Sequence, residues 1–156
     1  MPAWFDISGP DLSLKIDEDG IARSVSQIQA LIHAEKERGI PYANIILAGF
    51  SQGAVIALNT GITFPDKLGG IIALSGLLPN PETILQHAQP ANQDIPIFMA
   101  HGTQDMMVPI TLGDAAHQLL ANEGYHVNWH TYPMAHGVCP DEISDISQWI
   151  QNVWKI

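Results

Sequence analysis

Asn44-Ile45-Ile46-Leu47-Ala48-Gly49-Phe50-Ser51-Gln52-Gly53 is the stretch that decides the fold of this chain. Its last five residues read G-x-S-x-G, and the apolar run before them is typical of a strand buried on both faces. The apolar residues 54–58 that follow favour a buried helix. A G-x-S-x-G turn between a strand and a helix predicts a nucleophile elbow, which presents a serine hydroxyl at the top of a sheet. We expect Gly49 and Gly53 to let strand and helix approach closely around a strained Ser51.

Apolar strands and amphipathic helices alternate along the rest of the chain. The pattern predicts strands over residues 44–49, 70–75, 96–101 and 127–132, and helices over about 17–38, 52–64, 110–123 and 141–154. The first dozen residues are expected to form an irregular loop, and residues 79–94 a loop with one helical turn at 82–87. In the last helix one side is expected to face the core, namely Ile143, Ile146, Trp149, Ile150 and Val153.

This alternation predicts an α/β fold in a single domain over residues 1–156. About four strands would form a parallel sheet with helices on both faces and right-handed crossovers. In such a sheet the functional groups belong at the carboxyl ends of the strands.

Composition excludes several classes of partner. Six basic against sixteen acidic residues give a formal charge of −10, so nucleic acid and basic-patch membrane binding are not expected. The single cysteine, Cys139, cannot form an internal disulfide and fits a reducing cytoplasm. Without a signal sequence or an apolar run near 18 residues, we expect a cytoplasmic protein with no membrane span. The spacing of His, Cys and acidic residues matches no common metal motif, so no metal site is expected.

Two further residues follow strands in the order that a serine hydrolase needs. A serine requires a base within hydrogen-bond reach, and the base requires an acid that fixes its tautomer. Asp105 follows the third predicted strand, and His136 follows the fourth. Each has a plainer interpretation: Asp105 could cap the next helix, and His136 could be a solvated loop residue.

The remaining histidines and the cysteine favour structural roles. His101 sits at the end of a predicted strand, and we interpret it as structural. Cys139 lies near His136 and could be a reactive thiol, but a buried free cysteine is the favoured interpretation. The other five histidines show no partner pattern: His33, His87, His117, His126 and His130.

The three motifs together resemble the acyl-protein thioesterase and carboxylesterase family of α/β-hydrolases. The resemblance rests on Ala48–Gly53, on His101-Gly102-Thr103-Gln104-Asp105 with Val108-Pro109, and on Tyr132-Pro133-Met134-Ala135-His136-Gly137-Val138-Cys139. Trp4-Phe5-Asp6 and Leu74-Ser75-Gly76 match as well, so the likeness covers essentially the whole chain.

The resemblance implies specific roles and substrates. It makes Ser51 the nucleophile, Asp105 the acid and His136 the general base, with the backbone N–H of Gln52 as one oxyanion donor. It implies cleavage of carboxylic esters or thioesters, including those of acylated proteins, without a cofactor. The acyl pocket would be lined by Trp4, Phe5, Leu77 and Met107, which could equally be core residues.

One departure from the family pattern concerns the start of the chain. Family members begin with several dozen further residues, which hold the first strands and a His-Gly-Leu-Gly type loop that gives a second oxyanion N–H. Residues 1–6 here resemble an interior segment, so we expect a truncated member whose strand at 44–49 has an open edge. Such an edge predicts reduced stability and pairing of two copies, unless the first residues fold over it. A monomeric, cooperatively melting sample would count against this.

Two functional hypotheses therefore arise from the sequence. The first is a serine hydrolase that forms an acyl-enzyme on Ser51. The second is a non-catalytic remnant that keeps the elbow and serves as a binding or dimerisation module. The presence of all three triad positions favours the first.

Overall fold

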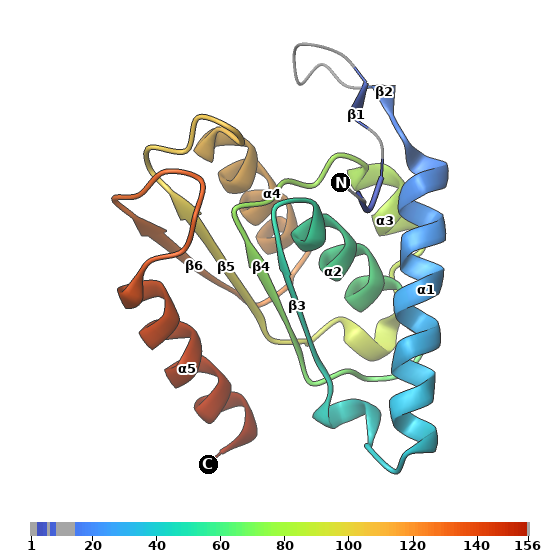
Figure 1. Cartoon of the computed structure of the whole chain (residues 1–156). Helices are drawn as coiled ribbons and strands as arrows, with labels where there is room; N and C mark the ends of the chain where they lie inside the picture. The colour runs from blue at the N-terminus through green and yellow to red at the C-terminus, as the bar shows by residue number, and fades with distance from the viewer. Residues whose placement is uncertain (1–2, 6, 9–14, 156) are drawn as a thin grey trace.

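The computed structural model describes residues 3–5, 7–8 and 15–155, and its centre is a four-stranded parallel sheet (Figure 1). The strand order is β3-β4-β5-β6, so successive strands are neighbours and each crossover carries at least one helix. The strands are β3 (Ile46–Phe50), β4 (Gly70–Leu74), β5 (Ile97–Gly102) and β6 (Val127–Tyr132). All four predicted strands are confirmed to within two residues at their ends.

The helices also follow the predicted pattern. They are α1 (Glu18–Glu37), α2 (Gln52–Thr63), α3 (Pro81–Gln86), α4 (Ile110–Asn122) and α5 (Pro140–Trp154), with 3-10 turns at Tyr42–Asn44 and Pro90–Asn92. Asp17 is the N-cap of α1, and its carboxylate accepts a hydrogen bond from the Gly20 N–H at 2.8 Å.

The expectation of an irregular loop over the first dozen residues is wrong in part. β1 (Ile7–Ser8) pairs antiparallel with β2 (Lys15–Ile16) in a separate two-stranded sheet. Strands of two residues are too short to show an alternating pattern, so the sequence carries no signal for them. Met1, Pro2, Asp6 and residues 9–14 lie outside the described part.

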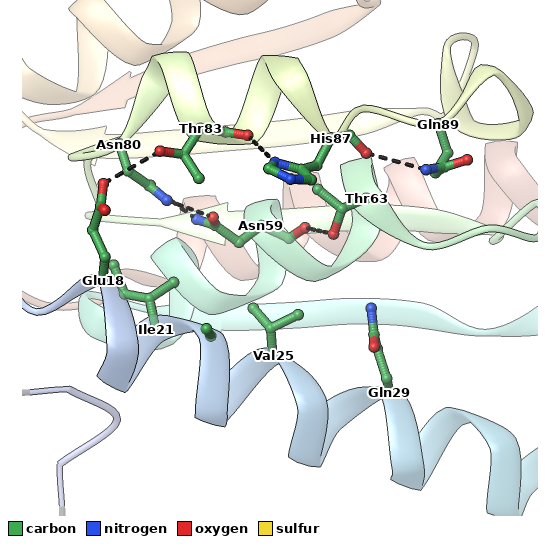
Figure 2. Close-up of a pocket in the computed structure, with 11 residues that line it drawn as sticks. Glu18, Ile21, Val25, Gln29, Asn59, Thr63, Asn80, Thr83, His87 and Gln89 are labelled. Carbon is green, nitrogen blue, oxygen red and sulfur yellow. Dashed lines mark hydrogen bonds between the residues drawn. The ribbon is translucent and has the colours of Figure 1, made fainter.

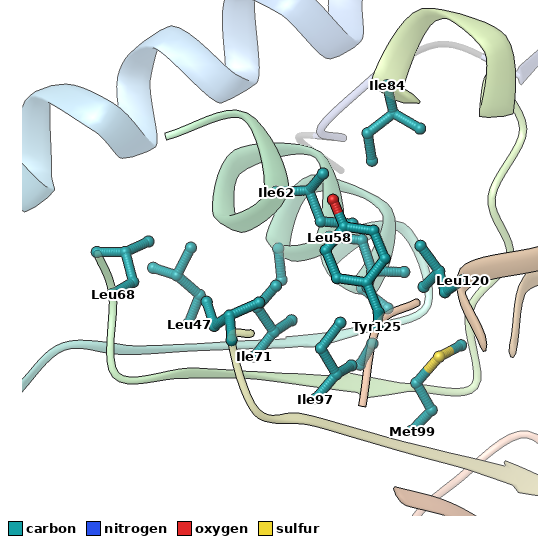
Figure 3. Close-up of a cluster of buried hydrophobic side chains, with 14 of the residues drawn as sticks. Leu47, Leu58, Ile62, Leu68, Ile71, Ile84, Ile97, Met99, Leu120 and Tyr125 are labelled. Atoms are coloured by element: carbon teal, nitrogen blue, oxygen red, sulfur yellow. The ribbon is translucent and has the colours of Figure 1, made fainter. Parts of the chain in front are cut away.

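Both faces of the sheet are covered by helices. The main core lies between the sheet and α1, α2 and α4, where Leu47, Ile71 and Ile97 of three neighbouring strands meet Leu58 and Leu120 (Figure 3). On the opposite face, α5 packs Trp149 against side chains from β4 and β5. Buried side chains thus pack on both faces of the sheet.

β3 is an edge strand within the described part of the chain, where it pairs only with β4. The expectation that this strand is buried on both faces is wrong: Ala48 and Phe50 are exposed, and only Leu47 on the opposite face is buried. Such an edge is where pairing with a second copy would occur. Association through β3 stays a prediction.

The buried face of α5 differs from the expected one at a single position. Ile146, Trp149, Ile150 and Val153 face the core as predicted, but Ile143 is 55% exposed. Glu142 is buried in its place, and both of its carboxylate oxygens lack a hydrogen-bond partner among the described residues. The sequence cannot predict that Glu142 is buried and Ile143 exposed, because charged residues are expected on the surface. The packing of α5 against the sheet determines which of the two side chains is buried.

We expect Glu142→Gln to stabilise the protein at alkaline pH by about 1 kcal/mol or more, since an unpartnered buried charge is costly. Burial raises the pKa of the Glu142 carboxyl above its ordinary 4.5, and the nearby backbone N–H of Cys139, which makes no well-formed hydrogen bond to it, opposes this rise only in part. The folded state therefore binds the proton more tightly than the unfolded state, and stability falls as pH rises from about 4.5 through the folded-state pKa.

Denaturant unfolding at pH 5 and pH 8 measures the effect of Glu142→Gln on stability. The advantage of Glu142→Gln over the native chain should be larger at pH 8, while Asp141→Asn, an exposed carboxyl in the same turn, should show no such gain. Equal unfolding free energies of the native chain and Glu142→Gln at pH 8 would contradict it.

No described helix is long and apolar enough to cross a membrane.

Candidate active site

Ser51 stands at the sharp turn between β3 and α2. Its backbone has φ 55° and ψ −116°, a conformation that a non-glycine residue rarely adopts. The turn is held by the Ser51 N–H, which donates to the Leu74 carbonyl of the neighbouring strand at 2.8 Å. The predicted elbow therefore has the strained backbone that lifts a side chain above the end of a sheet.

Only one of the two elbow glycines is required by packing. A Cβ at Gly49 would lie 2.0 Å from the carbonyl oxygen of Gly53, so strand and helix touch at this point. A Cβ at Gly53 would meet nothing closer than the Trp4 indole nitrogen at 3.8 Å. The expectation that both glycines permit a close approach is right for Gly49 and wrong for Gly53.

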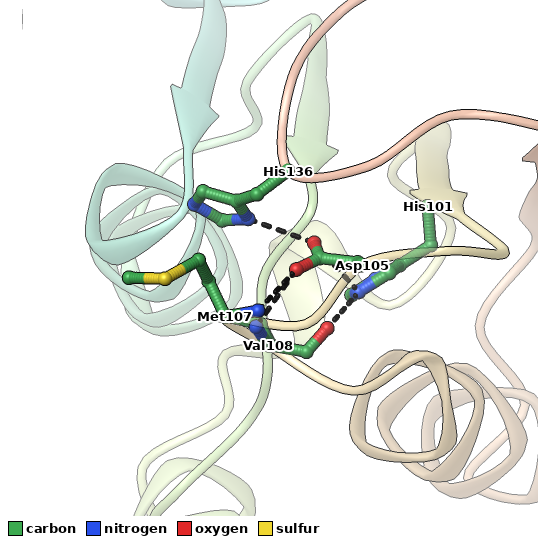
Figure 4. A network of polar contacts seen from close by, with 5 residues as sticks. All are labelled: His101, Asp105, Met107, Val108 and His136. Atoms are coloured by element: carbon green, nitrogen blue, oxygen red, sulfur yellow. Dashed lines mark hydrogen bonds and ion pairs between the residues drawn. The ribbon is translucent and has the colours of Figure 1, made fainter.

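Asp105 and His136 meet above the carboxyl ends of β5 and β6 (Figure 4). Asp105 Oδ2 lies 2.7 Å from His136 Nδ1, and Oδ1 accepts the backbone N–H groups of Met107 and Val108 at 2.9 Å each. The alternative that Asp105 caps α4 is wrong, because the N-cap of that helix is Pro109 and carries no side-chain cap. Asp105 instead stabilises the turn that precedes the helix while it holds the histidine.

The surroundings of Asp105 favour a carboxylate. Burial raises the pKa of this carboxyl, but hydrogen bonds from His136, Val108 and Met107 outweigh burial and leave the pKa below its ordinary 3.8. An ionised Asp105 accepts the hydrogen on Nδ1 of His136. The Nε2 atom of the neutral ring is then free to accept a proton.

Phe50 connects the elbow to the histidine. Its ring lies 4.7 Å from the His136 ring, centroid to centroid, at an angle of 49°. Ser51 is the next residue along the chain, so the end of β3 and the His136 segment are neighbours. Ser51 and His136 themselves share no hydrogen bond in the described part, a contact that in many hydrolases tightens only when substrate binds.

Gln52 is the first residue of α2 and joins the elbow to the start of the chain. Its side-chain Nε2 donates to the Phe5 carbonyl at 3.1 Å, and its Oε1 accepts the Trp4 N–H at 3.2 Å. The first backbone N–H groups of a helix have no partner inside the helix, which leaves the Gln52 N–H suited to an anion.

The four expected acyl-pocket residues fall into two groups. Trp4 and Met107 are exposed, at 43% and 68% of their surface. Phe5 is buried, and Leu77 packs against it in a small core cluster below the elbow. Phe5 and Leu77 thus have core contacts, and a role of all four in binding acyl chains stays a prediction.

Sequence reasoning missed the place of Phe50 beside the candidate site. Phe50 was only the variable position of the G-x-S-x-G pattern, and its contact with His136 depends on a loop 86 residues away along the chain. His101 is 1% exposed and lies beside Asp105, in agreement with its interpretation as a structural residue.

Of the other single residues considered in the sequence, several histidines have local partners and Cys139 lies at a helix end. Cys139 is half-buried at the N-terminus of α5. Three histidines contact side chains of their surroundings: His33 with Tyr42, His117 with Trp129 and His130 with Phe98. Within the described ranges, no group of three or more His, Cys, Asp or Glu side chains is arranged to hold a metal ion.

A pocket of about 370 Å³ lies away from this site, between α1, α2 and α3 (Figure 2). Its floor holds Asn59 and Asn80, two buried amides that hydrogen-bond to each other, and its walls include Ile21 and Val25 of α1. None of the predicted site residues lines it.

Comparison with known proteins gives the same family as the motifs. The Phospholipase/Carboxylesterase family model matches residues 1–154. Acyl-protein thioesterase 1 of Saccharomyces cerevisiae is 43% identical over 155 residues, which cover 97% of this chain and 68% of the relative. The protein of the same name from Yarrowia lipolytica is 38% identical over the same shares.

Solved structures agree. The crystal structure of Arabidopsis thaliana SOBER1 superposes with a TM-score of 0.90 at 30% identity, over 97% of this chain and 74% of SOBER1. The parallel sheet with helices on both faces is thus the α/β-hydrolase fold, of which this chain spans about 70% of the length in its relatives. The chain belongs to the phospholipase/carboxylesterase family of hydrolases.

Proposed function

We propose that this chain is a serine hydrolase that cleaves carboxylic esters or thioesters through an acyl-enzyme. Ser51 is the nucleophile, His136 the general base and Asp105 the acid that orients it. The observation that carries the proposal is the 2.7 Å contact between Asp105 Oδ2 and His136 Nδ1, beside a serine held in an elbow.

The first step activates the serine. Asp105 is fixed by two backbone N–H groups on one oxygen, so its other oxygen points steadily at His136. This contact keeps the hydrogen on Nδ1, and Nε2 then takes the hydroxyl proton of Ser51 as the Ser51 oxygen attacks the acyl carbon. The imidazolium that forms is stabilised by the carboxylate.

The second step stabilises and resolves the tetrahedral intermediate. The backbone N–H of Gln52 and the positive end of α2 face the developing oxyanion. His136 returns its proton to the leaving alcohol or thiol as the acyl–oxygen or acyl–sulfur bond breaks. Water then attacks the acyl-Ser51 ester with His136 as base, which releases the carboxylic acid and restores Ser51.

The surroundings of the elbow support an acyl substrate. Trp4, Phe50 and Met107 expose apolar surface near Ser51, Asp105 and His136, and such surface suits an alkyl chain. The relatives are named acyl-protein thioesterases, so the substrates proposed here are small to medium acyl esters and thioesters, including those on acylated proteins. The chemistry requires no cofactor.

A fluorophosphonate probe tests the proposal. We expect the purified chain to be labelled at Ser51, located by peptide mass spectrometry, and labelling to be abolished in His136→Ala. His126→Ala, which removes an exposed histidine outside the site, should label like the native chain. A folded sample without an adduct on Ser51 would favour the non-catalytic alternative.

A further inference from the structure

We propose that His101 is a positioning residue for the proposed reaction: its buried imidazole holds the Asp105 segment so that the carboxylate stays aimed at His136. This inference rests on the proposed function. It assigns a task to a histidine that does not reach Ser51 or a substrate.

The contacts of His101 define its protonation. Nε2 lies 2.8 Å from the carbonyl oxygen of Val108 and 3.5 Å from Asp105 Oδ2 (Figure 4). A carbonyl oxygen can only accept, so Nε2 must carry a hydrogen. That N–H therefore donates to the Val108 carbonyl in the turn that follows β5, while the Asp105 carboxylate lies at the longer distance.

The hydrogen bonds of Asp105 connect it to the same turn. Oδ1 accepts from the backbone N–H groups of Met107 and Val108, and Oδ2 accepts from His136 Nδ1. His101 thus binds the carbonyl of Val108, a residue whose own N–H binds the Asp105 carboxylate. The imidazole is therefore an additional support for the turn from Asp105 to Val108.

α4 fixes the other edge of the His101 ring. A Cβ at Gly113 would lie 2.3 Å from His101 Nδ1, so the first turns of this helix pack directly on the imidazole. The ring is also fully inside the protein, at 1% exposure. It cannot rotate without moving either α4 or the turn that carries Asp105.

The alternative is that His101 only fills the core. A core role and a positioning role both predict lower stability when His101 is replaced. Only the positioning role predicts that kcat and its pH dependence change in protein that is still folded, because a displaced carboxylate orients and stabilises the His136 imidazolium less well.

Four variants separate these roles. His101→Leu removes the Nε2 donor, while His101→Gln can place an amide N–H near the same position and should restore activity in part. Gly113→Ala keeps the imidazole but forces it from its place. Gly61→Ala is the matched control, because its Cβ would lie 2.4 Å from Ile71 in the core, away from the site.

The experiment measures thermal unfolding, ester hydrolysis against pH, and the proton NMR signal of the His136 Nδ1–H in each folded variant. We expect His101→Leu and Gly113→Ala to lower kcat about 10²-fold and to leave KM unchanged. The acid limb of the pH–rate profile should move to lower pH, and the downfield Nδ1–H signal should be lost. His101→Gln should lie between these variants and the native chain, and Gly61→Ala should keep native kcat, profile and signal.

The results distinguish a failure of the positioning role of His101 from a failure of the proposed function. If the native chain hydrolyses esters and His101→Leu and Gly113→Ala do so with native kcat, rate profile and Nδ1–H signal, the positioning role is refuted and the proposed function stands. If the native chain has no activity but shows the Nδ1–H signal, and the signal disappears in both variants, the proposed function fails while the structural link from His101 to Asp105 holds.

Discussion

Asp105→Asn is expected to lower kcat by about 10⁴-fold while the protein stays folded. The reason lies in the two backbone N–H groups of Met107 and Val108, which donate to one side of this side chain. They must keep facing an oxygen, so the new amide oxygen takes that side and the amide nitrogen faces His136.

That orientation reverses the hydrogen bond on which the proposed mechanism depends. An amide N–H donates to Nδ1 of His136, which forces the ring hydrogen onto Nε2. A protonated Nε2 cannot accept the Ser51 proton, so the base is lost although every heavy atom is close to its place. Steady-state ester hydrolysis, with circular dichroism to confirm folding, measures the loss.

Asp114→Asn is the matched control for this variant. Asp114 also lies next to a histidine, with its Oδ1 3.4 Å from Nδ1 of His117, but on the outer part of α4. It should keep native kcat. Equal kcat values for Asp105→Asn and the native chain would mean that His136 does not work through Asp105.

Gly49→Ala is expected to remove activity and to lower the free energy of unfolding by about 3 kcal/mol, at the upper end of overpacking costs. The new Cβ would fall 2.0 Å from the carbonyl oxygen and 2.2 Å from the carbonyl carbon of Gly53. Both are backbone atoms in the first turn of α2, so no side-chain rotation can relieve the overlap. The elbow must open, and Ser51 moves with it.

Gly53→Ala tests whether this cost belongs to the close approach or to any added methyl group in the motif. It lies in the first turn of α2 with no neighbour closer than 3.8 Å, and alanine favours a helix by up to about 1 kcal/mol over glycine. We expect native labelling of Ser51 and unchanged or higher stability. Similar losses in the two variants, by denaturant unfolding and probe labelling, would refute the explanation.

The arrangement of strands and helices could be predicted because local patterns specify it. The apolar runs at Ile46–Phe50 and Ile97–Gly102 are both parallel strands, and the second is buried along its whole length. Buried parallel strands leave a continuous apolar signal in the sequence. The meeting of Asp105 and His136 followed from topology, since parallel neighbouring strands end at the same edge of the sheet.

The sequence could not predict the side-chain contacts between separate elements, because no local sequence pattern specifies them. Phe50 at the end of β3 meets His136 in the loop after β6, and Gly113 of α4 packs on His101 of β5. The residue types alone do not mark either contact. Glu142 shows the same limit, because its burial follows from how α5 sits on the sheet and opposes the usual preference of a carboxylate for water.

Ser51 is proposed to attack an acyl carbon with the help of His136 and Asp105. The most direct test mixes the chain with an excess of p-nitrophenyl acetate, quenches within the first turnover and measures the mass of the protein and its peptides. We expect a burst of p-nitrophenol of about one equivalent per chain and one acetyl group, located on Ser51. A folded chain that releases p-nitrophenol without acetylation of Ser51, or that shows neither burst nor adduct, would contradict it.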